Sequence, residues 1–253
     1  SYEIGFSSDG IQWQSARSTR FDNAGLLSLG RIIFDGTLTG LQVDDIAVTP
    51  SKRNYIINGD IETLMANGKP ATWWVGSSIV ESTNPILGNV SMTVPSASNV
   101  STFAQTIAGS AATALNNCEL AMRFRLAATP TENTNNCRIK LRGPSSVDLL
   151  VLAVDASGLR AYDRVTNSFA DVAWTDGKPP IQMLAGTAYH LRVTARNLGG
   201  SNRSYDIALS ADGTNWKTGS ASSFATTSLL GVAGVLFDGT TIPITVDDVS
   251  ITP

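Results

Sequence analysis

The sequence predicts an all-β protein built as an antiparallel β-sandwich, and three observations lead to this. Apolar and polar residues alternate over several stretches of strand length, which buries one face of each strand and leaves the other in solvent. No stretch of helical length carries an apolar stripe with the helical period. Asp-Gly and Asn-Gly pairs separate the apolar stretches, and such pairs favour tight turns between strands. An antiparallel sandwich accommodates all three features.

The two ends of the chain carry the same half-domain. Residues 1–50 reappear, without insertion or deletion, as residues 204–253. The matches include Ser-x-Asp-Gly-x-x-Trp near the start of each copy, Phe-Asp-Gly-Thr in the middle and Val-Asp-Asp near the end. The repeat predicts a duplicated closing half-domain at 1–50, followed by a complete sandwich at 51–253. A body of roughly 200 residues lies within the range that sandwiches occupy as one domain.

The strands are expected in the following order. In the half-domain at the start of the chain they are predicted at 2–7, 11–16, 29–34 and 41–48. In the body, alternating patterns predict strands at 119–126, 138–142 and 189–196, and at 205–209 after a Gly-Gly turn. Residues 149–154 form a continuous apolar run, which is typical of a strand covered on both faces.

The last strand changes phase at an acidic pair. In residues 244–251 the apolar residues occupy even positions before Asp247 and Asp248 and odd positions after them. A regular strand cannot bury both sets, because each step of one residue turns the side chain to the other face. A β-bulge at the pair restores the phase. The same change occurs at Asp44 and Asp45, so both copies are expected to have a bulge.

Two segments of the chain resemble known sugar-binding sandwiches. The sequence Asn-Gly-Asp-Ile-Glu at 58–62 and the sequence Val-Asp-Asp-Val at 246–249 resemble the first and last strands of jelly-roll carbohydrate-binding modules found beside bacterial polysaccharide-degrading enzymes. Residues 189–216 resemble the laminin-G or concanavalin-A-like lectin jelly roll instead. Both resemblances imply a jelly-roll sandwich and noncatalytic glycan recognition.

A structural Ca²⁺ is expected near the acidic pair. Two adjacent carboxylates repel each other, and Ca²⁺, which takes several oxygen ligands, would relieve the repulsion. The alternative is that the pair is solvated or caps a turn. The resemblance to carbohydrate-binding modules implies that an opening Glu and a closing Asp meet at the ion. The predicted metal ligands are Asp60, Glu62, Asp247 and Asp248.

Charge and composition favour an extracellular or cell-surface protein. The formal net charge is −3, which gives no reason to expect nucleic acid or anionic membrane as a partner, because both attract clustered Lys and Arg. No apolar run approaches the roughly 18 residues that span a bilayer, so membrane insertion is not expected. Charged residues make up only 15% of the chain, while Ser, Thr, Asn and Gly are abundant, as in extracellular β proteins.

The residue types that enzymes use are scarce, so no catalytic activity is predicted. His190 is the one histidine, and it lies on the polar face of an alternating strand, where it is expected to be solvated. Two cysteines and one histidine do not supply a zinc site. A glycosidase needs paired carboxylates, whereas Glu62 and Glu81 are isolated and the usual Glu-x-Asp-x-x-Glu cluster of lectin-fold hydrolases is absent.

The sequence leaves open whether Cys118 and Cys137 form a disulfide. If they began two strands of a simple hairpin they would lie on the order of 25 Å apart, at about 3.3 Å per residue, which is too far for a bond. A longer crossover between two sheets would bring them together. In either case the pair is expected to be structural, with no redox role.

Tryptophans are the candidates for contacts with a glycan. Trp73 and Trp74 are adjacent, so on a strand they face opposite ways and one of them is expected in the core. The other, together with Trp174, is the candidate for an exposed platform. Trp13 and Trp216 occupy equivalent positions in the repeat and are expected to be structural.

Two functions remain open. One is a noncatalytic extracellular module for adhesion or carbohydrate binding in a tandem-repeat surface protein. The other is a structural subunit, without a ligand, of an extracellular filament assembled head-to-tail through strand exchange. Residues 1–50 carry apolar strand faces that need a covering layer, so self-association through this segment is expected unless it belongs to an upstream repeat.

Overall fold

The chain forms two compact units, Ser1–Pro50 and Ser51–Pro253. The computed structural model describes residues 2–6, 14–18, 54–96, 102–106, 114–175, 181–239 and 241–253. The strands predicted at 29–34 and 41–48, and the bulge predicted at Asp44 and Asp45, lie outside the described residues.

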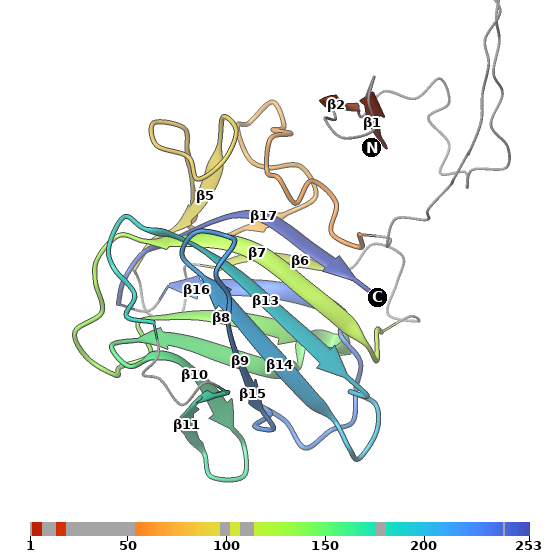
Figure 1. Cartoon of the computed structure of the whole chain (residues 1–253), viewed down its shortest axis with the longest axis vertical. Helices are drawn as coiled ribbons and strands as arrows, with labels where there is room; N and C mark the ends of the chain where they lie inside the picture. The colour runs from red at the N-terminus through yellow and green to blue at the C-terminus, as the bar shows by residue number, and fades with distance from the viewer. Residues whose placement is uncertain are drawn as a thin grey trace, which may run out of the picture. The chain divides into compact units, whose positions relative to one another are not determined.

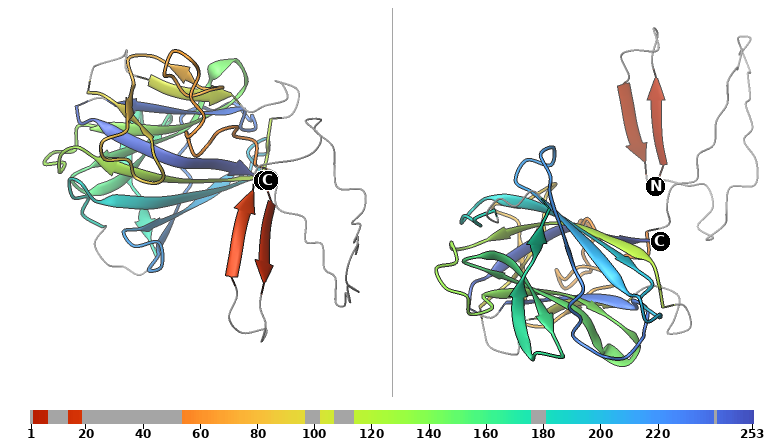
Figure 2. Two further views of the ribbon diagram at one scale, coloured as in Figure 1. Left: turned by 90° about the horizontal axis from the view of Figure 1, so that it is seen from above. Right: turned by 60° about the horizontal axis from the view of Figure 1, so that its bottom comes forward.

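Within the described residues, the body consists of two antiparallel sheets packed face to face (Figures 1 and 2). The first, called the β9 sheet, has the strand order β11 (Ser168–Asp171), β10 (Gly158–Asp163), β9 (Asp148–Asp155), β8 (Cys137–Arg142), β16 (Gly234–Gly239), β6 (Thr102–Thr106) and β3 (Trp74–Val75). The second, called the β13 sheet, has the order β12 (Ala173–Trp174), β15 (Lys217–Ala221), β14 (Ser204–Ser210), β13 (Ala188–Arg196), β7 (Cys118–Leu126), β17 (Ile244–Thr252), β5 (Ser91–Val94) and β4 (Ile79–Glu81).

Within the described residues, helical structure is confined to one short turn. The 3-10 helix η1 (Pro144–Ser146) connects β8 to β9. The described residues contain no helix that is long and apolar enough to cross a membrane.

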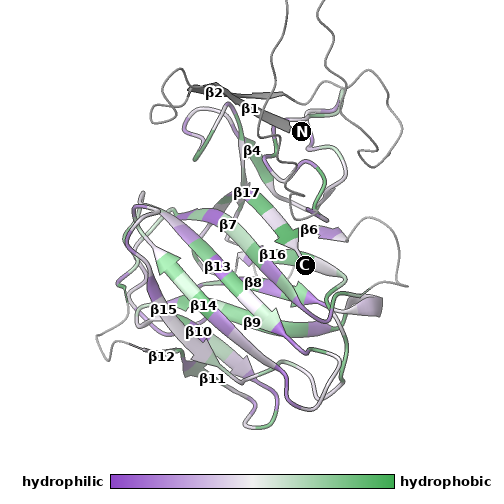
Figure 3. Ribbon diagram, turned by 45° about the vertical axis from the view of Figure 1, so that its right-hand side comes forward, coloured by the Kyte–Doolittle hydropathy of each residue, from purple (hydrophilic) through white to green (hydrophobic). Residues whose placement is uncertain are grey.

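The core lies between the sheets and follows the predicted alternation. Every second residue of β7 is buried from Cys118 to Leu126, and β8 and β13 alternate in the same way. Figure 3 shows the resulting hydrophobic and hydrophilic bands along β7, β13 and β14. The strand that was predicted to be covered on both faces is β9. Its residues are buried from Leu149 to Asp155, and within its sheet it lies between β8 and β10. Side-chain periodicity therefore predicted the layers correctly.

The connections between strands confirm the jelly-roll arrangement. The chain passes from one sheet to the other between β3 and β4, β5 and β6, β6 and β7, β7 and β8, β11 and β12, β15 and β16, and β16 and β17. Because β7 and β8 belong to different sheets, Cys118 and Cys137 do not lie on a simple hairpin. Both thiols are free and buried, and burial raises the pKa of the Cys118 thiol to about 12. This answers the question of the disulfide that the sequence left open.

The predicted β-bulge is present in β17. Its pairing with β7 shifts register between Asp247 and Ser250, and Asp248 has a φ of 50°. Val246 and Val249, on either side of the acidic pair, are both buried. The extra residue thus returns the apolar side chains to the core face, as the phase change required.

The opening segment of the body pairs with the closing strand. The amide of Tyr55 donates to the carbonyl of Ile251 (2.8 Å), and the amide of Val249 donates to the carbonyl of Gly59 (2.7 Å). A Cβ atom at Gly59 would lie 1.8 Å from the carbonyl oxygen of Val249, so a larger residue cannot approach this closely. Gly59 therefore allows the opening segment to lie close enough to β17 to pair with it.

The described part of the first unit repeats a hairpin of the body. β1 (Tyr2–Phe6) pairs with β2 (Gln14–Ser18), with Tyr2 opposite Ser18. In the body β14 pairs with β15 in the same register: Tyr205, the equivalent of Tyr2, lies opposite Ala221, the equivalent of Ser18. The sequence repeat thus extends to strand pairing.

Candidate functional site

A hollow of about 310 Å³ lies on the outer face of the β13 sheet, over β17, β7 and β13. The larger side chains that line it are Arg123, Arg192, His190, Trp216, Asp248 and Ser250. The strand register explains the space. Ala121 of β7 lies between Arg192 of β13 and Ser250 of β17, and its methyl group is too short to fill the gap between them. We call this site the outer hollow.

The Ser-x-Asp-Gly-x-x-Trp motif builds one wall of the outer hollow. Asp212 accepts hydrogen bonds from the backbone amide and the side chain of Asn215, both at 2.7 Å, and these lower the pKa of Asp212. Gly213 has a φ of +74°, in the left-handed region that favours glycine. The indole N–H of Trp216 donates to the carbonyl of Gly213 (3.1 Å), which fixes the ring beside the hollow. Trp216 was expected to be structural, but it is only half-buried and stands outside the core.

Arg192 and His190 meet at the ring of Trp216. The guanidinium carbon of Arg192 lies 4.3 Å from the ring centroid, and the imidazole of His190 meets the indole edge-on at 6.2 Å. Burial and then the positive charge of Arg123 lower the pKa of His190, so the imidazole is neutral at neutral pH. His190 is on the polar face as predicted, but it forms part of a wall instead of being freely solvated.

The bulge of β17 supplies the carboxylate of the outer hollow. About half of the Asp248 side chain is exposed (51%), and its Oδ2 lies 3.4 Å from Nε of Arg123. The Nε atom of Arg123 is buried and has no hydrogen-bond partner in the described part of the chain. Asp248 is the acidic side chain that lines the hollow, and its ion pair is with Arg123, whereas Arg192 has no ion pair within the described residues.

Two of the four predicted calcium ligands, Asp247 and Glu62, accept hydrogen bonds from the loop that connects β4 to β5. Asp247 is buried, and its Oδ2 accepts hydrogen bonds from the amide of Leu87 (3.0 Å) and the hydroxyl of Ser91 (2.8 Å). Glu62 reaches the same loop, where its Oε1 accepts a hydrogen bond from the amide of Asn89 (2.7 Å). The two carboxylates therefore fix this loop from two places in the chain.

The pKa values of these two carboxyl groups move in opposite directions. Burial raises the pKa of Asp247 to about 6, although hydrogen bonds from Ser91, Asp248 and Leu87 oppose this. Burial also acts to raise the pKa of Glu62, but hydrogen bonds from its loop partners outweigh it and the pKa is lowered. Folding therefore disfavours the ionised form of Asp247 and favours that of Glu62.

The four predicted ligands do not gather around one point. Asp60 is exposed, and Asp248 pairs with Arg123 in the outer hollow. Within the described residues, no group of three or more His, Cys, Asp or Glu side chains is arranged to hold a metal ion. Glu62 and Asp247 have N–H and O–H partners where a shared cation was expected, so the structure does not fit the four-ligand site. Calcium binding at these two carboxylates stays a prediction.

The predicted tryptophan platform is divided among three places. Trp73 is 5% exposed and stacks on Phe103 at 4.2 Å, so it is the core member of the adjacent pair and leaves Trp74 as the exposed one. Trp74 is 61% exposed on β3, at the edge of the β9 sheet. Trp174 is half-buried on β12, at the edge of the β13 sheet, with Nζ of Lys217 5.6 Å from its ring. The three rings form no common surface.

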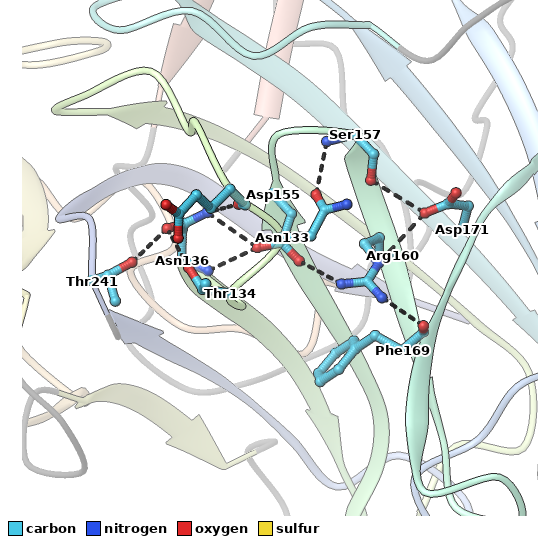
Figure 4. A network of polar contacts seen from close by, with 10 residues as sticks. Asn133, Thr134, Asn136, Asp155, Ser157, Arg160, Phe169, Asp171 and Thr241 are labelled. Carbon is cyan, nitrogen blue, oxygen red and sulfur yellow. Dashed lines mark hydrogen bonds and ion pairs between the residues drawn. The ribbon is translucent and has the colours of Figure 1, made fainter.

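A second polar cluster serves the fold (Figure 4). Asp155 is fully buried and accepts hydrogen bonds from the backbone amide (3.0 Å) and the side chain (3.1 Å) of Asn136 and from Arg160 (3.3 Å). Arg160 also donates to the carbonyl of Phe169 (2.7 Å) and lies 3.4 Å from Asp171. These contacts tie the loop before β8 to β9, β10 and β11, which satisfies the buried charge.

Sequence reasoning singled out Asp248 as a metal ligand but did not predict the other residues of the outer hollow as parts of a site. Arg123, His190 and Arg192 lie on the polar faces of two alternating strands, where side chains are ordinarily solvated. The signal that could have found them is the pairing of those strands, which places His190 opposite Arg123. Trp216 could be identified as a repeated residue. Its position in the turn after β14 did not predict whether it would lie on the core face or on the outer face of the β13 sheet.

No protein-family model and no curated protein matches the chain. Solved structures of similar fold include the receptor-binding domain of botulinum neurotoxin type G, with 14% identity, a TM-score of 0.41, and 74% of this chain and 44% of that chain covered. The Ca²⁺-bound exoplasmic/lumenal domain of VIP36 has 12% identity and a TM-score of 0.45, over 79% of this chain and 89% of that one. A carbohydrate esterase from Shiga toxin-encoding bacteriophage phi24B has 14% identity and a TM-score of 0.48, over 74% and 93%.

The chain spans less than half the length of the neurotoxin structure that it matches, at 44%. All of these likenesses concern the fold alone, so the ligand has to be inferred from the outer hollow of this chain.

Proposed function

We propose that residues 51–253 form a noncatalytic carbohydrate-binding module whose ligand occupies the outer hollow. The observation that carries this proposal is the meeting of an aromatic ring with several hydrogen-bond donors in one hollow. Sugars present hydroxyl groups beside apolar C–H surfaces, and ligand sites combine apolar walls with a few convergent polar groups. The volume of about 310 Å³ suits a small ligand unit, such as part of a glycan chain.

The side chains of the outer hollow support binding over catalysis. A glycosidase needs two carboxyl groups beside the scissile bond, whereas Asp248 alone lines the hollow and it pairs with Arg123. A serine hydrolase needs a histidine bonded to both its serine and its aspartate. The hydroxyl of Ser250 instead donates to the carbonyl of Ala121 (3.4 Å), and β7 separates the strand of Ser250 from the strand of His190.

Filling the outer hollow tests the proposal. The full chain is applied to a glycan array, and the glycans that bind are titrated by isothermal calorimetry. Ala121→Leu should weaken binding about tenfold or more, because the larger side chain occupies the ligand's space. Thr194→Leu is the matched control, since it adds a similar side chain to the same sheet face outside the hollow. A blank array, or equal loss in both variants, would contradict the proposal.

Tryptophan variants separate the outer hollow from the platform that the sequence suggested. Trp216→Ala should weaken glycan binding, while Trp74→Ala and Trp174→Ala should leave the affinity within about twofold of the wild type. Loss of binding in Trp74→Ala or Trp174→Ala with none in Trp216→Ala would place the glycan at a sheet edge instead.

We further propose that the module belongs to an extracellular tandem-repeat surface protein, in which adhesion is the role of glycan binding. The shared register of β1–β2 and β14–β15 supports this, because it makes the described hairpin of the first unit equivalent to a hairpin near the end of the body. Residues 1–50 also carry the motif of the tryptophan wall and the acidic pair. An upstream copy would thus have two elements of the same hollow.

The filament alternative rests on the same hairpin. An identical register would let β1–β2 of one chain replace β14–β15 of another, and a head-to-tail exchange of this kind generates open assemblies. Sedimentation velocity of the full chain over a range of concentrations, beside a chain of residues 51–253, tests it. Association of the full chain alone would favour the filament, and a full chain that stays monomeric throughout would count against it.

A further inference from the structure

Among the described side chains that line the outer hollow, two are positively charged and one is negatively charged. Arg123 and Arg192 both line it, and Asp248 is the acidic side chain among its lining residues. Asp248 pairs with Arg123 at 3.4 Å. Within the described residues, the ion pairs of the hollow consist of this one contact, so the guanidinium of Arg192 keeps its hydrogen-bond donors for another group. A neutral sugar would leave Arg192 without an ion-pair partner.

The ring of Trp216 orients Arg192. The guanidinium carbon lies 4.3 Å from the ring centroid, a distance at which the positive group is attracted to the aromatic face. Because the guanidinium covers one face of the indole, that face is not open to a sugar ring, although Trp216 still lines the hollow. The N–H donors of arginine lie in the plane of its guanidinium, in a fixed fork. The tryptophan therefore holds a donor group beside the hollow, which differs from a stacking platform.

Arg123 adds a second positive charge to the lining of the hollow. Its Nε atom is buried and has no hydrogen-bond partner among the described residues, although Asp248 lies near it. Because this atom is covered by protein and already faces Asp248, it is not open to a ligand, and Arg123 contributes its positive charge to the hollow. Arginine binds carboxylates with two parallel hydrogen bonds, which neutral oxygen acceptors do not match in strength.

We propose that the outer hollow selects sugars that carry a carboxylate group, as uronic acids do. Arg192, held against Trp216, receives the carboxylate, and the positive charge of Arg123 adds to the attraction. Ser250 and the neutral His190 are left for hydroxyl groups of the same sugar. This inference rests on the proposed function, because it names the class of glycan that the site takes.

The experiment compares each polyuronate with its own neutral ester. Alginate, polygalacturonate and hyaluronan, each as the free acid and as the methyl ester, are titrated against the full chain by affinity electrophoresis and calorimetry, together with a panel of neutral glycans. At least one free acid should bind about tenfold or more tightly than its ester, since esterification removes the charge that the arginines receive. Arg192→Gln should reduce that preference to about twofold or less, and Arg192→Lys should restore part of it, because charge returns without the fork.

Arg196→Gln is the matched control for non-specific attraction. Arg196 lies on the same strand and face, outside the hollow, and pairs with Asp206 at 2.6 Å. Equal losses in the Arg192→Gln and Arg196→Gln variants would overturn the inference, as would equal binding of acid and ester, or binding of neutral or sulfated glycans in preference to uronates. Those outcomes leave the proposed function standing, whereas binding to no acidic or neutral glycan would remove both.

Discussion

Replacing Asp247 by asparagine should remove a pH dependence of folding stability. Asp247 is buried in β17, and burial raises its pKa from 3.8 to about 6. The folded state thus binds this proton more tightly than the unfolded state. The stabilisation that this proton provides is fully present when the pH is below the pKa of Asp247 in the unfolded state. It is lost as the pH rises through the pKa of Asp247 in the folded state. The window therefore extends from pH 3.8 to about pH 6.

The magnitude follows from the shift. One pKa unit corresponds to about 1.4 kcal/mol, so the wild type should lose about 2 to 3 kcal/mol between about pH 4 and pH 7 that the Asp247→Asn variant keeps. Glu62, on the same loop, acts in the opposite sense: its pKa is lowered, so its stabilisation is lost as the pH falls through the folded pKa. Because Glu62 is present in both proteins, its contribution cancels when the two are compared.

Urea denaturation of the full chain at a series of pH values measures this difference. The free energy of unfolding of Asp247→Asn minus that of the wild type should rise steadily between about pH 4 and pH 6 and then level off. Asp60→Asn is the control, because it removes an exposed carboxylate from the same predicted metal set. A difference that stays constant with pH for Asp247→Asn would refute the reasoning that burial controls this group.

Three further predictions follow from the structure. If Ca²⁺ binds at Glu62 and Asp247, adding calcium should raise the melting temperature of the protein at neutral pH by mass action. A melting temperature that changes neither with calcium nor with a chelator would show that the site does not exist. Trp73→Ala should destabilise the body by about 3 to 5 kcal/mol in urea denaturation, because it empties a core position, whereas Trp74→Ala should cost less than about 1 kcal/mol; equal losses would contradict their placement. Cys118 and Cys137 should resist a thiol reagent in the native protein and both react in denaturant, so rapid labelling of the native chain would show that they are not buried.

The candidate site shows where prediction from sequence stops. The acidic pair predicted the bulge, because the change of phase is visible in one strand. It did not predict that Asp247 would hold the loop before β5 while Asp248 would face Arg123. Both carboxylates were assigned to one cation, since the sequence gives no partner for either. Their actual partners come from segments far away in the chain.

The sequence by itself determined the properties that depend on neighbouring residues and on the repeat. Alternation predicted which face of β7, β8 and β13 is buried, because consecutive side chains of a strand point to opposite sides. The repeat predicted equivalent strands in the two units, and the β1–β2 hairpin agrees with β14–β15 residue by residue.

Only the tertiary structure decided the outer hollow. Its central row brings together Ser250, Ala121 and Arg192, from three strands that are distant in the sequence. A shift of one residue in either pairing would turn a different set of side chains outward and place a longer one where Ala121 leaves space. Register between distant strands is set by the packing of the whole sandwich, and no local pattern in the chain records it.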